Sequence, residues 1–249
     1  MFAELRYFLA AVQVLTRLPV PALRGFDEEW LERGVKYFPL AGALVGAACA
    51  VILLAASKLW GGTLPALLTI AAGIAITGGL HEDGFADFFD SMGGATREAR
   101  FAIMKDSRLG TYGVLALGAG VGAKILALAA LPAALGAAAL VAVHAGGRLA
   151  AVAVISMLPY AGGISAAKIK PLGHGITRAD LAIAIFLGLL PLFLLPLTIG
   201  LPAFAAAAAA STLAALYARH SFGGYTGDVL GAVEQTYETA FLLAAAACV

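Results

Sequence analysis

Long apolar stretches are the feature that most restricts what this chain can fold into. A helix needs about 20 mostly apolar residues to cross roughly 30 Å of hydrocarbon, and 61% of the 249 residues are hydrophobic whereas 12% are charged. Seven stretches have this character: 38–57, 63–80, 109–131, 133–158, 181–199, 201–218 and 229–249. We therefore expect an all-α, polytopic integral membrane bundle of about seven transmembrane helices, with residues 1–249 forming one membrane-embedded domain.

The charged residues are concentrated between the expected spans. The longer connecting segments are 1–37, 81–108, 159–180 and 219–238. If these segments share one face of the membrane, that face carries all 15 acidic residues and 13 of the 16 basic ones. The exceptions are Lys58 in an outer turn and Lys124 and Arg148 within spans. Because basic segments are retained in the cytoplasm, we expect a protein of the cytoplasmic (inner) membrane with its charged face in the cytoplasm.

The N-terminal segment and the overall charge add further limits. Residues 1–16 have an apolar face at helical spacing, which predicts an interfacial helix on the bilayer surface; this face consists of Phe2, Leu5, Phe8, Leu9, Val12 and Leu15. The formal net charge of +1 gives no reason to expect a nucleic acid as a partner. Cys49 and Cys248 lie within apolar stretches, so neither a disulfide framework nor a cysteine zinc site is expected.

A stripe of carboxylates opens the segment 81–108. On a helix, Asp83, Asp87 and Asp90 have the spacing i, i+4 and i+7, which places them on one face. Glu82 is turned about 100° away. Converging carboxylates repel one another unless a hard divalent cation such as Mg²⁺ lies between them. An ordinary solvated acidic loop is the alternative, but phenylalanines on the other side of the helix favour a metal site that binds a substrate diphosphate.

Basic residues follow the carboxylates directly. They are Arg97, Arg100, Lys105 and Arg108. Each of them could contact phosphate oxygens, an arginine through two hydrogen bonds and a lysine as a point charge. For any one of them, a lipid headgroup contact or a role in setting topology is an equally good interpretation. For Lys105 and Arg108, which flank Asp106, we favour substrate binding.

A second acidic cluster lies near the C-terminus, where Asp228, Glu234 and Glu238 precede or enter the last apolar stretch. Carboxylates that enter hydrocarbon are costly and are therefore functional candidates; alternatively, both glutamates remain in the headgroup layer. Arg148 is expected about 15 Å inside its span, at about 1.5 Å per residue, where it must meet a substrate phosphate or a carboxylate such as Glu234. Lys124 is nearer the outer end of its span and is expected to extend outward to the headgroups.

Six short motifs in this order resemble those of the cobalamin synthase (adenosylcobinamide-GDP ribazoletransferase) family. They are Leu15-Thr-Arg-Leu-Pro19, Phe38-Pro-Leu-Ala-Gly42, Gly79-Leu-His-Glu-Asp-Gly-Phe-Ala-Asp87 with Asp90, Ile103-Met-Lys-Asp-Ser-Arg-Leu-Gly-Thr-Tyr-Gly113, Gly147-Arg148 and Tyr225-Thr-Gly-Asp228. The resemblance covers residues 15 to 238, and the third and fourth motifs are specific in combination. The loop 167–175 departs from the family pattern, which leaves Lys168 and Lys170 without a clear role.

The resemblance implies a reaction and a cofactor. A hydroxyl of α-ribazole, or of its 5′-phosphate, would attack the cobinamide-side phosphorus of adenosylcobinamide-GDP and release GMP, with Mg²⁺ required. On this hypothesis Asp83, Asp87 and Asp90, with Glu82, hold the metal, and Asp83 is essential to catalysis. Lys105, Arg108 and Arg148 would neutralise phosphate charge. Asp228 or Glu234 would act as general base or hold a second metal. The implied partners are both substrates and the lipid bilayer, with a homo-oligomer or a complex with other cobalamin-assembly enzymes as a further expectation.

Two other classes of protein compete with this interpretation. A CDP-alcohol phosphotransferase also carries an Asp-Gly motif beside a membrane helix, but its Asp-Gly-x-x-Ala-Arg pattern fails because Asp87 follows Ala86 where arginine would stand. A cation or proton transporter could use membrane carboxylates, but such sites lie near the midplane between repeated halves. Here the acids gather at one face and no repeat is visible, which favours the enzyme.

Overall fold

Helices make up the regular structure of the protein. The structure is a computed structural model that describes residues 3–21, 28–162 and 176–249, and these residues contain helices and no β-strand, which confirms the all-α fold. The α-helices are α1 (Ala3–Leu15), α2 (Glu28–Gly34), α3 (Phe38–Leu59), α4 (Leu64–Thr77), α5 (Leu80–Asp90), α6 (Arg97–Met104), α7 (Thr111–Ala130), α8 (Ala133–Met157), α9 (Arg178–Leu189), α10 (Leu197–Phe222) and α11 (Gly227–Ala247).

Four helical segments in the described part of the chain are long and apolar enough to cross a membrane. They are Trp30–Leu59, Thr111–Ala130, Ala133–Met157 and Leu197–Phe222. Helices α4 and α5 pass the same test only together, across a bend of 92°, which would make five. The expected number of about seven is therefore not confirmed. Helix α9 has only 12 residues, and α11 carries three carboxylates along 21 residues.

The break between the expected spans 181–199 and 201–218 lies at a different place. The sequence predicts a turn near residues 200–202, but α10 already begins at Leu197 and contains Pro202 within its helix. The break falls instead at Pro196, which has φ −55° and ψ 137° and precedes the first helical residue. Proline is well suited to the start of a helix because its missing N–H has no intrahelical acceptor there.

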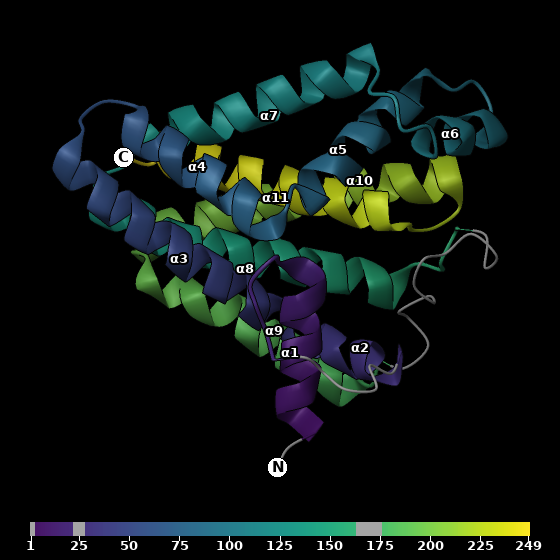
Figure 1. The fold of residues 1–249 in the computed structure, drawn as a ribbon, viewed down its shortest axis with the longest axis horizontal. Coiled ribbons are helices and arrows are strands. Elements are labelled where there is room, and N and C mark those ends of the chain that lie inside the picture. Colours follow the sequence, from purple (N-terminus) through teal and green to yellow (C-terminus); the bar gives the residue numbers. More distant parts are fainter. Residues whose placement is uncertain (1–2, 22–27, 163–175) are drawn as a thin grey trace.

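Helix α8 forms the centre of the bundle and packs along α3 and α11 (Figure 1). In the most apolar 18-residue stretch of α8, 72% of the residues are buried inside the protein. Small residues bring α3 close to it: a Cβ atom on Gly46 would lie 2.8 Å from the Cα atom of Val141. Lipid is as apolar as the helices themselves, so association in a bilayer depends on such close backbone packing.

Two glycines redirect the chain into α5. Gly78 and Gly79 both have φ of 71°, in the left-handed region that glycine adopts without a steric penalty. Helix α5 then lies against α11, since a Cβ atom on Gly84 would be 2.8 Å from the Cα atom of Asp228, and one on Gly231 would be 3.0 Å from the carbonyl oxygen of His81. This contact unites the two acidic clusters of the sequence.

The predicted N-terminal helix is present as α1. It packs with Ala10, Ala11, Val12 and Leu15 buried, whereas Leu5 is exposed and Phe2 lies outside the described residues. Only part of the expected apolar face is therefore turned toward the protein. A position of α1 at the bilayer surface stays a prediction.

The close approach of α3 and α8 can be tested with one added methyl group. Gly46→Ala is expected to lower the free energy of unfolding by about 1–3 kcal/mol because the new Cβ overlaps the α8 backbone. Gly118→Ala is the control, since nothing lies within 4 Å of a Cβ there, and it should be neutral or stabilising by up to about 1 kcal/mol. Unfolding with a denaturing detergent in mixed micelles, followed by circular dichroism, measures both. Equal free energies of unfolding for Gly46→Ala and Gly118→Ala would contradict the close packing of α3 on α8.

Candidate active site

An open cavity of about 460 Å³ lies where α5 meets the loop that follows α6. Its polar lining consists of Glu82, Asp83, Asp87, Lys105, Asp106 and Ser107. The first three side chains come from α5 and the last three from the loop. Carboxylates and a cation thus meet around one space that is large enough to admit part of a ligand.

Asp83 and Asp87 of α5 lie near one member of the second acidic cluster, Asp228. The negative charges of Asp228, Asp83 and Asp90 all act on the Asp87 carboxylate. Among the described residues, neither Asp83 nor Asp87 forms an ion pair with a cation. The expected gathering of carboxylates along one helical face is present, and α11 adds Asp228 to it through the contact at Gly84.

These oxygens suit a magnesium ion that keeps most of its water ligands. In the described part of the chain, no three histidine, cysteine, aspartate or glutamate side chains already converge on one metal position. Magnesium is commonly held by one or two carboxylates together with water and substrate phosphates. Asp83 and Asp87, as hard ligands in an electronegative cavity, satisfy that requirement without a third protein ligand.

Asp90 does not line the cavity. Its two carboxylate oxygens accept hydrogen bonds from the backbone N–H groups of Gly110 and Gly113, at 2.7 and 2.8 Å. Only 8% of the residue is exposed. Although it has the helical spacing predicted for a metal ligand, its oxygens are already engaged elsewhere.

The predicted phosphate ligands occupy different environments. Lys105 lines the cavity. Arg108 is directed to solvent, with 87% of its side chain exposed, and its Nη2 atom lies 2.6 Å from Oδ2 of Asp106. Hydrogen bonds from the side chain and backbone of Arg108 lower the pKa of the Asp106 carboxyl to about 2. Arg97 and Arg100 lie over the rings of Phe101 and Tyr217.

Arg148 lies in a second, buried cluster rather than in the cavity. It is 1% exposed, and its Nη1 atom is 2.7 Å from Oε1 of Glu234 and 2.6 Å from Oε1 of Glu238. His144, one helical turn earlier, places Nδ1 2.7 Å from the same Glu238 oxygen. Of the two predicted partners for Arg148, the structure therefore favours the carboxylate.

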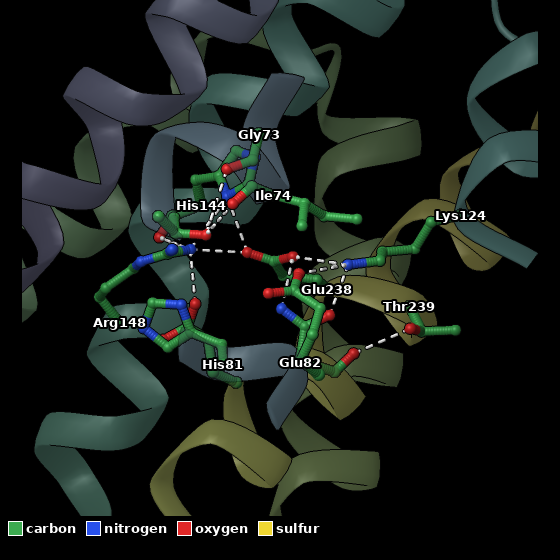
Figure 2. A network of polar contacts seen from close by, with 12 residues as sticks. Gly73, Ile74, His81, Glu82, Lys124, His144, Arg148, Glu238 and Thr239 are labelled. Carbon is green, nitrogen blue, oxygen red and sulfur yellow. Dashed lines mark hydrogen bonds and ion pairs between the residues drawn. The ribbon is translucent and has the colours of Figure 1, made fainter. Parts of the chain in front are cut away.

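The expected outward orientation of Lys124 is wrong. The residue is 3% exposed, and its ammonium group contacts Gln235 and Glu238 and lies 3.8 Å from Glu82 (Figure 2). Lys124 and Arg148 approach Glu238 from opposite sides (Figure 2). An internal carboxylate offers a stronger partner than the headgroup layer, because two opposite charges that meet inside the protein are weakly screened.

Two histidines of this cluster were not predicted as functional. His81 places Nε2 3.0 Å from Oε2 of Glu234, and His144 contacts both Glu238 and Arg148. Spacing offered a partial signal, since His144 and Arg148 are four residues apart on one helix face. The partner glutamates come from α11, however, and no local pattern identifies them.

Glu82 is the residue that the buried cluster and the open cavity share. It lines the cavity beside Asp83 and also a small internal space of about 20 Å³ beside Lys124 and Arg148. Glu234, by contrast, is 1% exposed and reaches only the buried side. Most of the predicted site residues therefore fall into two adjoining groups, whereas Asp90 and Arg108 belong to neither. Lys168 and Lys170 lie outside the described residues.

Comparison with known proteins identifies the family. A sequence model described as cobalamin-5-phosphate synthase matches residues 7–246. The chain belongs to the cobalamin-5-phosphate synthase family. It is 42% identical to the adenosylcobinamide-GDP ribazoletransferase of Leptothrix cholodnii over 96% of this chain and 94% of that one. Proteins of the same name from Ralstonia nicotianae (39% identical, 92% and 90% covered) and Shewanella frigidimarina (36%, 94% and 92%) are also similar.

Membership of the cobalamin-5-phosphate synthase family confirms the expected family and class of enzyme, a transferase of cobalamin biosynthesis. No solved structure matches the chain.

The buried position of Lys124 leads to a test against an exposed lysine. Lys124→Met should lower the free energy of unfolding by about 3–5 kcal/mol, because it leaves internal carboxylates with one cation fewer. Lys58→Met, at an exposed position at the end of α3, should change it by less than about 1 kcal/mol. Unfolding in mixed micelles compares the two. Similar losses would instead support a lysine that extends to the membrane surface.

Proposed function

We propose that the protein transfers the adenosylcobinamide phosphate group from adenosylcobinamide-GDP to α-ribazole or to its 5′-phosphate. A hydroxyl oxygen of the acceptor forms a bond to the cobinamide-side phosphorus, and the bond from that phosphorus to the bridging oxygen breaks. The hydroxyl proton passes to a base, and GMP leaves. The products are adenosylcobalamin or its 5′-phosphate.

The observation that carries the proposal is the cavity between α5 and the loop after α6. Transfer between a diphosphate and a hydroxyl needs positive charge near the phosphorus and a base near the attacking oxygen. The cavity places Lys105 opposite the carboxylates Asp83 and Asp87. The names of the relatives, together with the match over residues 7–246, support the same reaction.

Asp83 and Asp87 are the proposed magnesium ligands. When bound there, Mg²⁺ supplies positive charge against the substrate diphosphate and the departing GMP. Lys105 contacts a phosphate oxygen as a point charge, and Arg108, between the lining residues Ser107 and Leu109, supplies a second contact from solvent. Glu82 supports the site from the boundary with the buried cluster.

Asp228 is the proposed general base for the acceptor hydroxyl. Its backbone packs on Gly84 beside the cavity aspartates, and it is only partly buried. Glu234, the other predicted base, is 1% exposed and bound to Arg148. We therefore assign Glu234 and Arg148 to supporting the structure around the site and not to contact with substrate.

Replacing the carboxylate of Asp83 with an amide tests the site. Asp83→Asn should reduce Mg²⁺-dependent GMP release at least about a hundredfold, because several kcal/mol of charge stabilisation in the transition state are lost. Purified protein in lipid, supplied with adenosylcobinamide-GDP and α-ribazole with and without Mg²⁺, provides the assay.

Glu98→Gln is the matched control, since it makes the same change of charge at an exposed position of α6 outside the cavity. It should retain wild-type activity. Wild-type protein that forms no cobalamin with either acceptor in any lipid would overturn the proposed reaction. Full activity of Asp83→Asn would overturn only the assignment of this residue.

The proposed cytoplasmic location of the site requires α6 and the start of α11 to share one side of the membrane. In a background with the exposed Cys248 changed to serine, single cysteines at Ala95 and Gly227 should react with a membrane-impermeant reagent in inside-out vesicles. A cysteine at Gly61, in the short turn after α3, should react in right-side-out vesicles. Reaction of Ala95→Cys and Gly227→Cys from opposite sides would exclude a single composite site.

A further inference from the structure

Asp90 joins the end of α5 to the start of α7. The N–H group of Gly110 donates to its Oδ2 atom at 2.7 Å, and the N–H group of Gly113 donates to its Oδ1 atom at 2.8 Å. Gly110 is the N-cap residue of α7. One carboxylate therefore accepts hydrogen bonds from the N-cap residue and from the third helical residue.

Helix α7 has no N-cap side chain of its own, because its N-cap residue is a glycine. The first N–H groups of a helix have no intrahelical acceptor, and an N-cap aspartate would normally bind the second or third of them. Asp90 performs this role from another helix. Its negative charge also lies at the positive end of the α7 dipole.

Both glycines leave room for this contact. A Cβ atom on Gly110 would lie 2.9 Å from Cγ of Asp90, and one on Gly113 would lie 3.0 Å from that same atom and 3.0 Å from the carbonyl oxygen of Ala86. The carboxylate thus fits against bare backbone.

The contact holds one end of the loop that lines the proposed active site. Residues 105–110 connect α6 to α7, and Lys105, Asp106 and Ser107 of this loop face the cavity. The loop is attached to α6 at one end and, through Asp90, to α5 at the other. Asp83 and Asp87, the other wall of the cavity, belong to that same α5 helix.

We propose that Asp90 is a positioning residue that fixes the 105–110 loop, and with it Lys105, opposite the α5 carboxylates, and that it is not a magnesium ligand. The part of the inference that concerns substrate rests on the proposed function. The part that concerns the loop rests on the two hydrogen bonds alone.

Hydrogen–deuterium exchange on the full chain in lipid, without magnesium or substrate, tests the loop. In Asp90→Asn, amides in peptides that cover residues 107–114 should exchange about tenfold or more faster, because hydrogen bonds to a charged acceptor are weakened or lost. Gly113→Ala should have the same local effect from the other side of the contact. Glu98→Gln is the matched control and should exchange like the wild type, and α8 peptides report whether each variant is folded.

Kinetics separate a positioning residue from a ligand. Asp90→Asn and Gly113→Ala should both raise the KM for adenosylcobinamide-GDP by about tenfold, while the Mg²⁺ concentration for half-maximal activity stays within about twofold of wild type. Asp83→Asn, a proposed ligand, is the reference for a loss that depends on the metal.

Two results would overturn the inference. One is wild-type exchange over residues 107–114 in Asp90→Asn. The other is a rise of at least about tenfold in the half-activating Mg²⁺ concentration for Asp90→Asn but not for Gly113→Ala, as expected for a lost ligand. If Asp90→Asn does not fold, Gly113→Ala decides whether the contact fixes the loop: wild-type exchange over residues 107–114, or an unchanged KM for adenosylcobinamide-GDP, would then overturn the inference. Wild-type protein without activity would refute the proposed reaction and leave the exchange result to decide the role of Asp90.

Discussion

The pairing of charges inside the bundle is the constraint on which the rest of the structure depends. Removing an ion from water costs several kcal/mol even after relaxation, so a buried arginine must have well-placed partners. Arg148 obtains them from Glu234 and Glu238 on α11, and Lys124 reaches the same α11 from α7. Because Lys124 and Arg148 both pair with Glu238, these contacts join α7 and α8 to the same part of α11.

The position of α11 in turn determines the cavity. Close contacts at Gly84 and Gly231 hold α5 against α11, and α5 carries Glu82, Asp83 and Asp87. Glu82 lies at the boundary, with Lys124 on its buried side and the cavity on its open side. The buried cluster and the proposed active site therefore adjoin each other at α5.

Aspartates with the same predicted role occupy different environments. The stripe Asp83, Asp87 and Asp90 follows from helical periodicity, and α5 is indeed a helix over these positions. Periodicity gives the direction of each side chain from its own helix but not what the neighbouring segments present to it. The bare backbone of Gly110 and Gly113 lies opposite Asp90, whereas open space lies opposite Asp83 and Asp87.

Composition, periodicity and short motifs predict the helical class, the acidic stripe and the family, because these patterns lie within single segments of the chain. Contacts between distant segments determine which carboxylates are open, that Lys124 turns inward, and that Arg148 and Glu234 pair away from the cavity. Lys124 and Glu238 are 114 residues apart, and Arg148 and Glu238 are 90 apart. The free energy of a buried charge depends on the partner brought to it by folding, and no local pattern contains that partner.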